Sequence, residues 1–177
     1  MSDDVGRPAG PAALLGPGAI RLAERAAGKA DAIRACGEVL VATGAVTPEY
    51  VPAMLEREES VSTYIGEGVA IPHATLAGKA AVRRDALCFL RFPDGVDWDG
   101  ETVTVCIGIA AVGDGHLDIL AELAQVLLDP ERAEALRTAE SPDRVLAMLT
   151  PAAEDDPTGP SAAGPLEAAV PAERGER

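Results

Sequence analysis

One segment, TVTVCIGIA at residues 102–110, is apolar at almost every position and rich in residues that favour strands. A strand with one face in water alternates apolar and polar side chains, and this segment does not. We therefore predict a strand that is covered on both faces, as in a sheet between layers of helices. A second apolar run at residues 85–92 is joined to it by the turn-rich PDGVDWDG, which predicts a hairpin or two neighbouring strands.

Helical patterns lie on both sides of these strands. The first ends before Gly44, which stands where a helix often terminates in a glycine. Thr47 and Pro48 have the character of a cap and a first helical residue. The predicted helices cover residues 29–43, 47–58, 116–128, 131–138 and 141–149. Helices interleaved with strands in this way indicate one layered α/β domain.

The chain of 177 residues is long enough for one ordinary domain with additional segments. Residues 1–18 are rich in glycine and proline without periodicity, so we predict a loose arm that contributes little to the core. Residues 151–177 form an acidic, Pro/Ala-rich stretch that cannot bury enough apolar area to offset its ordering entropy. We predict a disordered tail or linker there and a folded unit at residues 19–150.

The composition excludes several classes of partner. A formal net charge of −14 would repel nucleic acid and anionic lipid over most of the surface. No apolar run approaches the length of a membrane span, and the acidic start is unlike a signal peptide. The three cysteines, Cys36, Cys88 and Cys106, form no CxxC pair and lie in apolar sequence, which fits buried free thiols in a reducing cytosol. We therefore expect a cytoplasmic protein.

The chain has two histidines, and both stand at positions that suit chemistry. His73 follows GEGVAIP, so we predict that it lies near the surface where a short strand ends. His116 lies between the buried strand and the next predicted helix. Strand-end loops that lead into helices are where open α/β sheets bind ligands, so both histidines could face one site. Each histidine considered separately, without an alignment, is more often a surface residue or a hydrogen-bonded structural residue than a catalytic one.

Together these histidines fit phosphoryl transfer. A neutral imidazole is a good nucleophile near pH 7, and a second imidazole can balance the group that the first acquires. Phosphoryl transfer also needs donors for the equatorial oxygens, and Arg57 in AMLEREES is the candidate for a fork-shaped donor. Its spacing alone favours a solvated residue at the end of an acidic helix.

Other candidate sites are weaker. Three acids at a helix end are more typical of a solvated face than of a metal site, and three aspartates near Trp98 fit a tight turn better than a calcium loop. These acids are Glu56, Glu58 and Glu59, and Asp94, Asp97 and Asp99. The sequence contains neither a Walker A loop nor a GxGxxG motif. We predict no metal and no cofactor.

Two motifs, GEGVAIPH and GIAAVGDGHL, occur in an order and spacing that resemble a known family. The likeness extends over residues 29–149, through ADAIRACGEVLVATGAVTPEY, MLERE, STYIG, CFLRFPDGVDWDG and HLDILAELAQVLLD. The chain resembles the IIA components of the bacterial sugar phosphotransferase system, in the mannitol branch of the mannitol/fructose class. The resemblance implies a central mixed sheet flanked by helices.

The resemblance also implies a phosphoryl carrier. His73 matches the histidine that accepts the phosphoryl group from phospho-HPr and passes it to a cysteine on the IIB domain of a mannitol permease. His116 matches the second active-site histidine, and Arg57 matches the arginine that contacts the phosphoryl group. Membrane association would come only through the permease. A glycine often follows the phosphorylated histidine in this family, whereas Ala74 follows it here. The sequence therefore does not decide the backbone conformation at this position.

Three alternatives remain at this point. The chain would also fit a fructose-type or regulatory IIA component, distinguished by the IIB thiol that drains its phosphoryl group. It would fit a docking module without turnover, although the intact His73, Arg57 and His116 favour retained chemistry. A small hydrolase that uses His116 and Asp118 is the alternative from another class, and it lacks a visible nucleophile or oxyanion loop.

Overall fold

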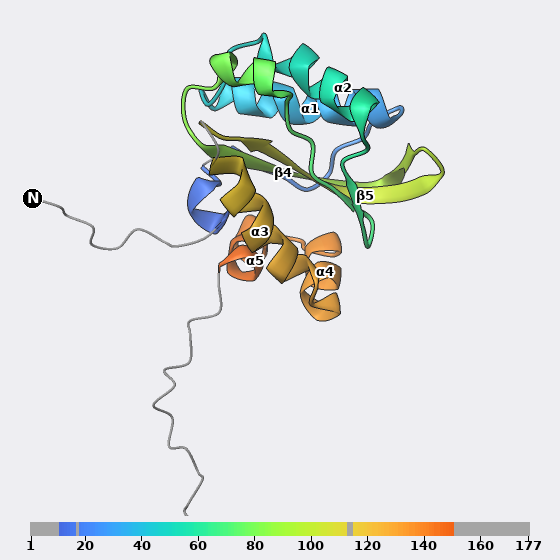
Figure 1. Ribbon diagram of the computed structural model, residues 1–177. Helices are drawn as coiled ribbons and strands as arrows, with labels where there is room; N and C mark the ends of the chain where they lie inside the picture. The colour runs from blue at the N-terminus through green and yellow to red at the C-terminus, as the bar shows by residue number, and fades with distance from the viewer. Residues whose placement is uncertain (1–10, 17, 113–114, 151–177) are drawn as a thin grey trace, which may run out of the picture.

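The computed structural model describes residues 11–16, 18–112 and 115–150, with the backbone alone at Gly115 and His116 (Figure 1). A mixed sheet lies between two layers of helices, with α1 and α2 on one face and α3, α4 and α5 on the other. The predicted fold class is confirmed. The elements are η1 (Pro11–Leu14), β1 (Ile20–Arg21), α1 (Lys29–Ala42), α2 (Tyr50–Ser60), β2 (Tyr64–Gly66), β3 (Val69–Ala70), η2 (Leu76–Ala81), β4 (Ala86–Trp98), β5 (Glu101–Ala110), α3 (Gly115–Leu127), α4 (Pro130–Arg137) and α5 (Pro142–Leu149).

The five helices form where the periodicity predicts them, and their ends follow the local chemistry. Ser141 caps α5 by accepting a hydrogen bond from the backbone of Arg144, and Asp129 caps α4 in the same manner. One start is shifted: α2 begins at Tyr50, after a turn in which the carbonyl of Thr47 accepts from the N–H of Tyr50. The cap and the proline therefore lead into the helix rather than open it.

The five strands lie in the order β1-β4-β5-β3-β2. The β4 and β5 strands form the predicted antiparallel hairpin, and β3 pairs with β5 in parallel. The hairpin is longer than expected because β4 continues through a register shift between Arg91 and Val96, and only Asp99 and Gly100 form the turn. Both turn residues have positive φ, and the carboxylate of Asp97 accepts from the N–H of Gly100. Of the three aspartates predicted in a tight turn, Asp99 lies in the turn and Asp97 accepts a hydrogen bond from it, whereas Asp94 lies in β4 where the register shifts.

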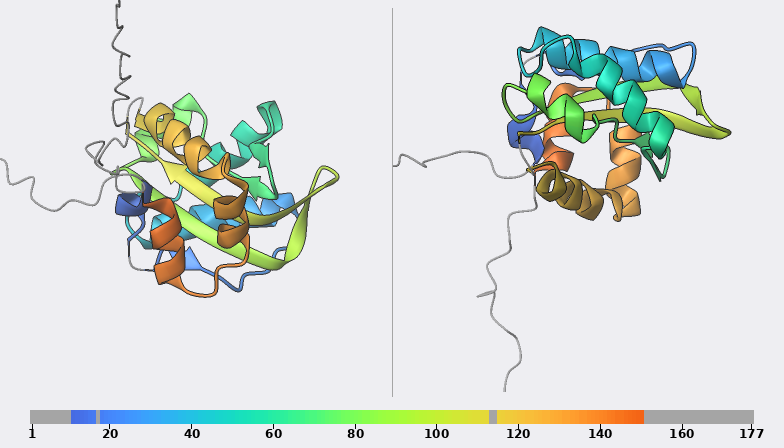
Figure 2. Two further views of the ribbon diagram at one scale, coloured as in Figure 1. Left: turned by 90° about the horizontal axis from the view of Figure 1, so that it is seen from below. Right: turned by 45° about the horizontal axis from the view of Figure 1, so that its top comes forward.

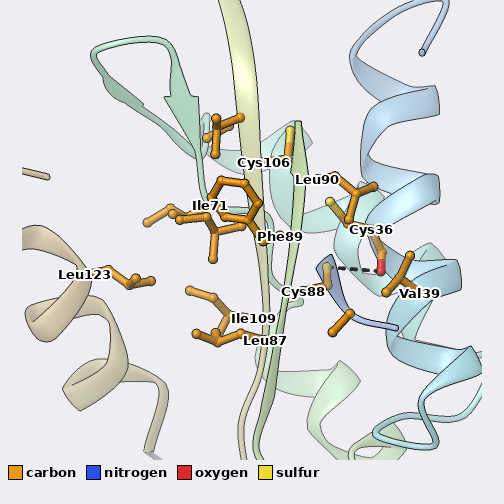
Figure 3. Close-up of a cluster of buried hydrophobic side chains, with 14 of the residues drawn as sticks. Cys36, Val39, Ile71, Leu87, Cys88, Phe89, Leu90, Cys106, Ile109 and Leu123 are labelled. Atoms are coloured by element: carbon orange, nitrogen blue, oxygen red, sulfur yellow. Dashed lines mark hydrogen bonds between the residues drawn. The ribbon is translucent and has the colours of Figure 1, made fainter. Parts of the chain in front are cut away.

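Each face of the central strands packs against a helical layer. Figure 3 shows Cys88, Leu90 and Cys106 toward α1, and Leu87, Phe89 and Ile109 toward α3. All three cysteines are buried and free, as predicted. Hydrogen bonding with Cys106 raises the pKa of Cys36 well above its usual range, and burial does the same for Cys88. The thiols of Cys36 and Cys88 therefore stay protonated and act as small apolar side chains.

Gly108 lies opposite Cys88 in this packing, and its lack of a side chain matters. A Cβ at this position would lie 2.6 Å from Cys88 Sγ and 3.1 Å from Cys36 Cβ. We expect Gly108→Ala to lower the free energy of unfolding by about 1–3 kcal/mol through overpacking, measured by urea denaturation. Gly16→Ala is the matched control because a Cβ there meets nothing within 4 Å. Equal midpoints for the two variants would contradict the packing argument.

The N-terminal segment differs from the prediction. The sequence predicts a loose arm at residues 1–18, but within it η1 packs against α3 and α5, and Ala12 and Leu15 are buried in the core. Short apolar residues without periodicity gave no sign of this contact. The rest of the proposed arm at residues 1–10, and the proposed tail at residues 151–177, lie outside the described residues. Within the described ranges, no helix is long and apolar enough to cross a membrane.

Candidate functional site

His73 lies where the chain leaves β3 and passes the end of β5. Ile71 donates its N–H to the carbonyl of Thr63 at 3.0 Å, and the carbonyl of Pro72 accepts from the N–H of Ile109 at 2.9 Å. These bonds continue the sheet pairing up to the residue before the histidine. His73 is therefore partly buried at a strand end, the position that the sequence predicts.

A hydrogen bond of the His73 ring fixes its tautomer. Nδ1 lies 2.8 Å from the carbonyl oxygen of Ile71. A carbonyl oxygen only accepts, so Nδ1 carries the hydrogen, and in the neutral ring Nε2 carries the lone pair. The nucleophilic nitrogen of His73 is therefore Nε2.

His73 and Arg57 line the same open cavity, which has a volume of about 520 Å³. Its walls come from α2, from the segment that follows His73, and from α3. Figure 2 shows α2 and η2 side by side on one face of the sheet, so residues distant in sequence meet at the cavity. The other residues of the wall are Tyr50, Glu56, Ala74, Thr75, Leu76, Ala77, Lys79, Val82, Ile109, Ala111, Leu117 and Leu120.

Arg57 belongs to the last turn of α2, on the side that meets the cavity. Its Nη1 donates to the carbonyl of Val61 at 2.7 Å. A guanidinium has five N–H donors, so this bond leaves several for an anion in the cavity. Lys79 adds a second cation to the wall, and Glu56 adds one carboxylate.

Glu58 corrects the prediction of a solvated acidic face. Glu56 and Glu59 are exposed, but Glu58 is only 6% exposed because it shares the buried stripe of α2 with Tyr50 and Met54. Its Oε1 accepts from Trp98 Nε1 at 2.9 Å, and its Oε2 accepts from the backbone N–H and the hydroxyl of Thr63. Lys29 Nζ lies 3.6 Å from Oε1. Glu58 therefore anchors the last turn of α2, directly beside Arg57.

His116 is the second residue of α3. Its neighbour Leu117 and, one turn on, Leu120 line the cavity, so the helix begins beside His73. The His116 side chain and residues 113–114 lie outside the described parts of the chain. The role of His116 stays a prediction, as do the roles of His73 and Arg57.

Ala74 fits the backbone that the structure gives it. In the described ranges, the non-glycine residues with positive φ are Glu67 and Asp99, so Ala74 has no left-handed strain. Its methyl group lies beside Gly78, where a Cβ would come within 2.8 Å of it. The missing side chain of Gly78 makes room for Ala74.

The sequence patterns assign no role to two residues of the cavity wall, Tyr50 and Lys79. Lys79 lies in η2, in a stretch between the predicted elements. Tyr50 falls on the buried face of α2, where periodicity predicts core packing and says nothing of its hydroxyl. Neither Tyr50 nor Lys79 belongs to a sequence motif that would predict a functional role.

The family model of the phosphoenolpyruvate-dependent sugar phosphotransferase system, EIIA 2, matches residues 13–151. The chain belongs to this family. The mannitol-specific phosphotransferase enzyme IIA component of Halalkalibacterium halodurans is 44% identical over 136 residues, which make up 77% of this chain and 94% of that protein. The resemblance that the two histidine motifs carry is thereby confirmed.

Solved structures of IIA proteins share the fold. The crystal structure of IIA mannitol from Escherichia coli has a TM-score of 0.71 and 40% identity, and the match covers 76% of this chain and 98% of that one. A complex of enzyme IIA mannitol with phosphorylated enzyme IIB mannitol, also from Escherichia coli, contains a chain with a TM-score of 0.72 and 39% identity. That match covers 76% of this IIA chain and 96% of the other.

Proposed function

We propose that this IIA protein is a cytoplasmic phosphoryl carrier of a mannitol phosphotransferase system. It accepts a phosphoryl group from phospho-HPr on Nε2 of His73 and passes it to a cysteine of a IIB domain. The observation that carries the proposal is the Nδ1–H bond to the Ile71 carbonyl, which directs the lone pair of the ring to Nε2. The mannitol-specific relative and the IIA–IIB complex support the choice of partners.

The transfer is an in-line displacement that needs positioning and charge compensation. Nε2 of His73 attacks the phosphorus, the bond from phosphorus to the donor breaks, and the bonding electrons leave with the donor. Nδ1–H remains hydrogen-bonded to the Ile71 carbonyl, which stabilises the positive charge that the ring gains. Arg57 donates to the equatorial oxygens, and His116 is proposed to assist from the start of α3. A IIB thiolate then attacks the same phosphorus and restores neutral His73.

The proposal is tested by phosphorylation in a purified system. The protein is incubated with radiolabelled phosphoenolpyruvate, Enzyme I and HPr, followed by IIB domains of mannitol-type and fructose-type permeases in parallel. We expect acid-labile label on the protein and its rapid loss to the mannitol-type IIB domain. Absence of label would refute the carrier role, and faster loss to the fructose-type domain would assign the chain to the alternative branch.

Arg57→Gln is expected to slow uptake from phospho-HPr by about 10-fold to 100-fold, the value of a charged hydrogen bond to the transferring group. Rapid-quench measurement of label transfer gives the rate. The matched control is Arg34→Gln, which makes the same change of charge on the exposed surface of α1. Equal slowing in both variants would mean that Arg57 acts only through net charge.

A further inference from the structure

Tyr50 makes a contact that none of the predicted site residues explains. Tyr50 is the first residue of α2 and is only 3% exposed, and it lines the same cavity as His73. Its hydroxyl donates to the carbonyl of Ile109 and accepts from the N–H of Ala74 at 3.3 Å. The hydroxyl thus joins the end of β5 to the residue that follows His73.

The backbone of Ile109 consequently holds both peptides that flank His73. The N–H of Ile109 donates to the carbonyl of Pro72, the residue before His73, at 2.9 Å. Its carbonyl reaches the N–H of Ala74 on the following side through the Tyr50 hydroxyl. Ile109 of the buried strand β5 therefore fixes the peptide groups before and after His73. The Nδ1–H bond to the Ile71 carbonyl fixes the imidazole ring itself.

We infer that Tyr50 is a positioning residue for phosphoryl transfer, which holds the backbone around His73 so that the ring keeps its tautomer and its direction. The inference rests on the proposed function of His73. In-line transfer to and from two different proteins needs Nε2 at a reproducible place, and small displacements of a reacting atom are costly. A tyrosine meets this need because its ring packs in the core while its hydroxyl satisfies two backbone groups.

The bridge requires a protonated hydroxyl. The Ile109 carbonyl only accepts, so the Tyr50 O–H must donate to it while a lone pair accepts from Ala74. Burial raises the pKa of Tyr50 to about 12, so the hydroxyl remains protonated throughout the physiological range. Tyr50 therefore acts through hydrogen bonds and not as an acid or base.

The test compares Tyr50→Phe with Tyr64→Phe, which alters the other tyrosine of the chain. Tyr64 is the matched control because its hydroxyl also accepts from a backbone N–H, that of Gly68 at 3.4 Å, yet it lies outside the cavity wall. Both variants keep an aromatic ring and lose one hydroxyl. Thermal unfolding sets an assay temperature at which both variants and the parent protein are folded.

The first readout is single-turnover transfer from phospho-HPr over a range of donor concentrations. We expect Tyr50→Phe to lower the maximal rate about tenfold without a change in the donor concentration for half-maximal rate, because two backbone groups lose their partner. Tyr64→Phe should stay within about twofold of the parent rate. Equal rates for Tyr50→Phe and the parent would overturn the inference.

The second readout is nitrogen NMR of the His73 ring in the unphosphorylated protein, assigned by comparison with the His73→Asn variant. The parent should show mainly the Nδ1–H tautomer, and Tyr50→Phe should show a mixture of both tautomers. An unchanged ring spectrum together with a slower rate would mean that Tyr50 only stabilises the fold. If the parent protein accepts no phosphoryl group, the proposed function fails, and the ring spectra alone still decide whether Tyr50 orients His73.

Discussion

His73→Asn is expected to lower phosphoryl uptake by at least about 10⁴-fold, as removal of an enzyme's nucleophile does. The asparagine amide can donate to the Ile71 carbonyl in place of Nδ1–H, so the hydrogen bond of 2.8 Å has a substitute. No atom of asparagine replaces Nε2. Label from phosphoenolpyruvate, passed through Enzyme I and HPr, measures the loss.

The control for this variant is its stability, because a misfolded protein would also fail to accept label. We expect the free energy of unfolding of His73→Asn to lie within about 1 kcal/mol of the parent value, since the side chain is only partly buried. Retained label on a folded His73→Asn protein would place the nucleophile elsewhere, with His116 as the remaining histidine.

Glu58→Ala is expected to lower the free energy of unfolding by about 3–5 kcal/mol, as the loss of one partner from a buried charged network does. The change strands the indole N–H of Trp98 and the N–H and hydroxyl of Thr63. It also leaves the ammonium of Lys29 with Asp99 as its remaining carboxylate partner, at 2.7 Å. Trp98 is 1% exposed, so water does not replace the lost acceptor. Urea denaturation with a matched m-value measures the effect.

Glu59→Ala is the control for Glu58→Ala, because the adjacent carboxylate is exposed and carries the same charge. Its effect should lie within about 0.5 kcal/mol of zero. If the two variants unfold at the same urea concentration, Glu58 does not hold the end of α2, and the position of Arg57 must have another cause.

The features that could be predicted from the sequence follow from local periodicity and from residue types that are rare in the chain. The apolar segment at residues 102–110 lies in β5, which is buried on both faces at residues 105–110 as expected. His73 stood out because the chain has only two histidines, and the glycines and proline before it predicted a strand end. Arg57 was ambiguous by spacing, and the family motifs singled it out.

The features that the sequence did not predict depend on contacts between distant segments. Glu58 looked like a solvated acid because its partners Trp98 and Lys29 come from other elements. The burial of η1 depends on α3 and α5, which lie more than a hundred residues later in the chain. The bridge through the Tyr50 hydroxyl joins a helix, a strand and a loop, and no periodicity encodes such a meeting.

The packing of η1 against α5 brings the first and last elements of the described domain together. A domain whose ends meet can be spliced into a longer polypeptide at little cost in closure entropy, because neither flanking chain has to travel around it. A circular permutant that joins these two ends by a short peptide should accordingly retain the native architecture. Ends that meet in this way are compatible with covalent fusion of the domain to a donor or acceptor domain. Such a tether raises the local concentration of the partner in phosphoryl transfer.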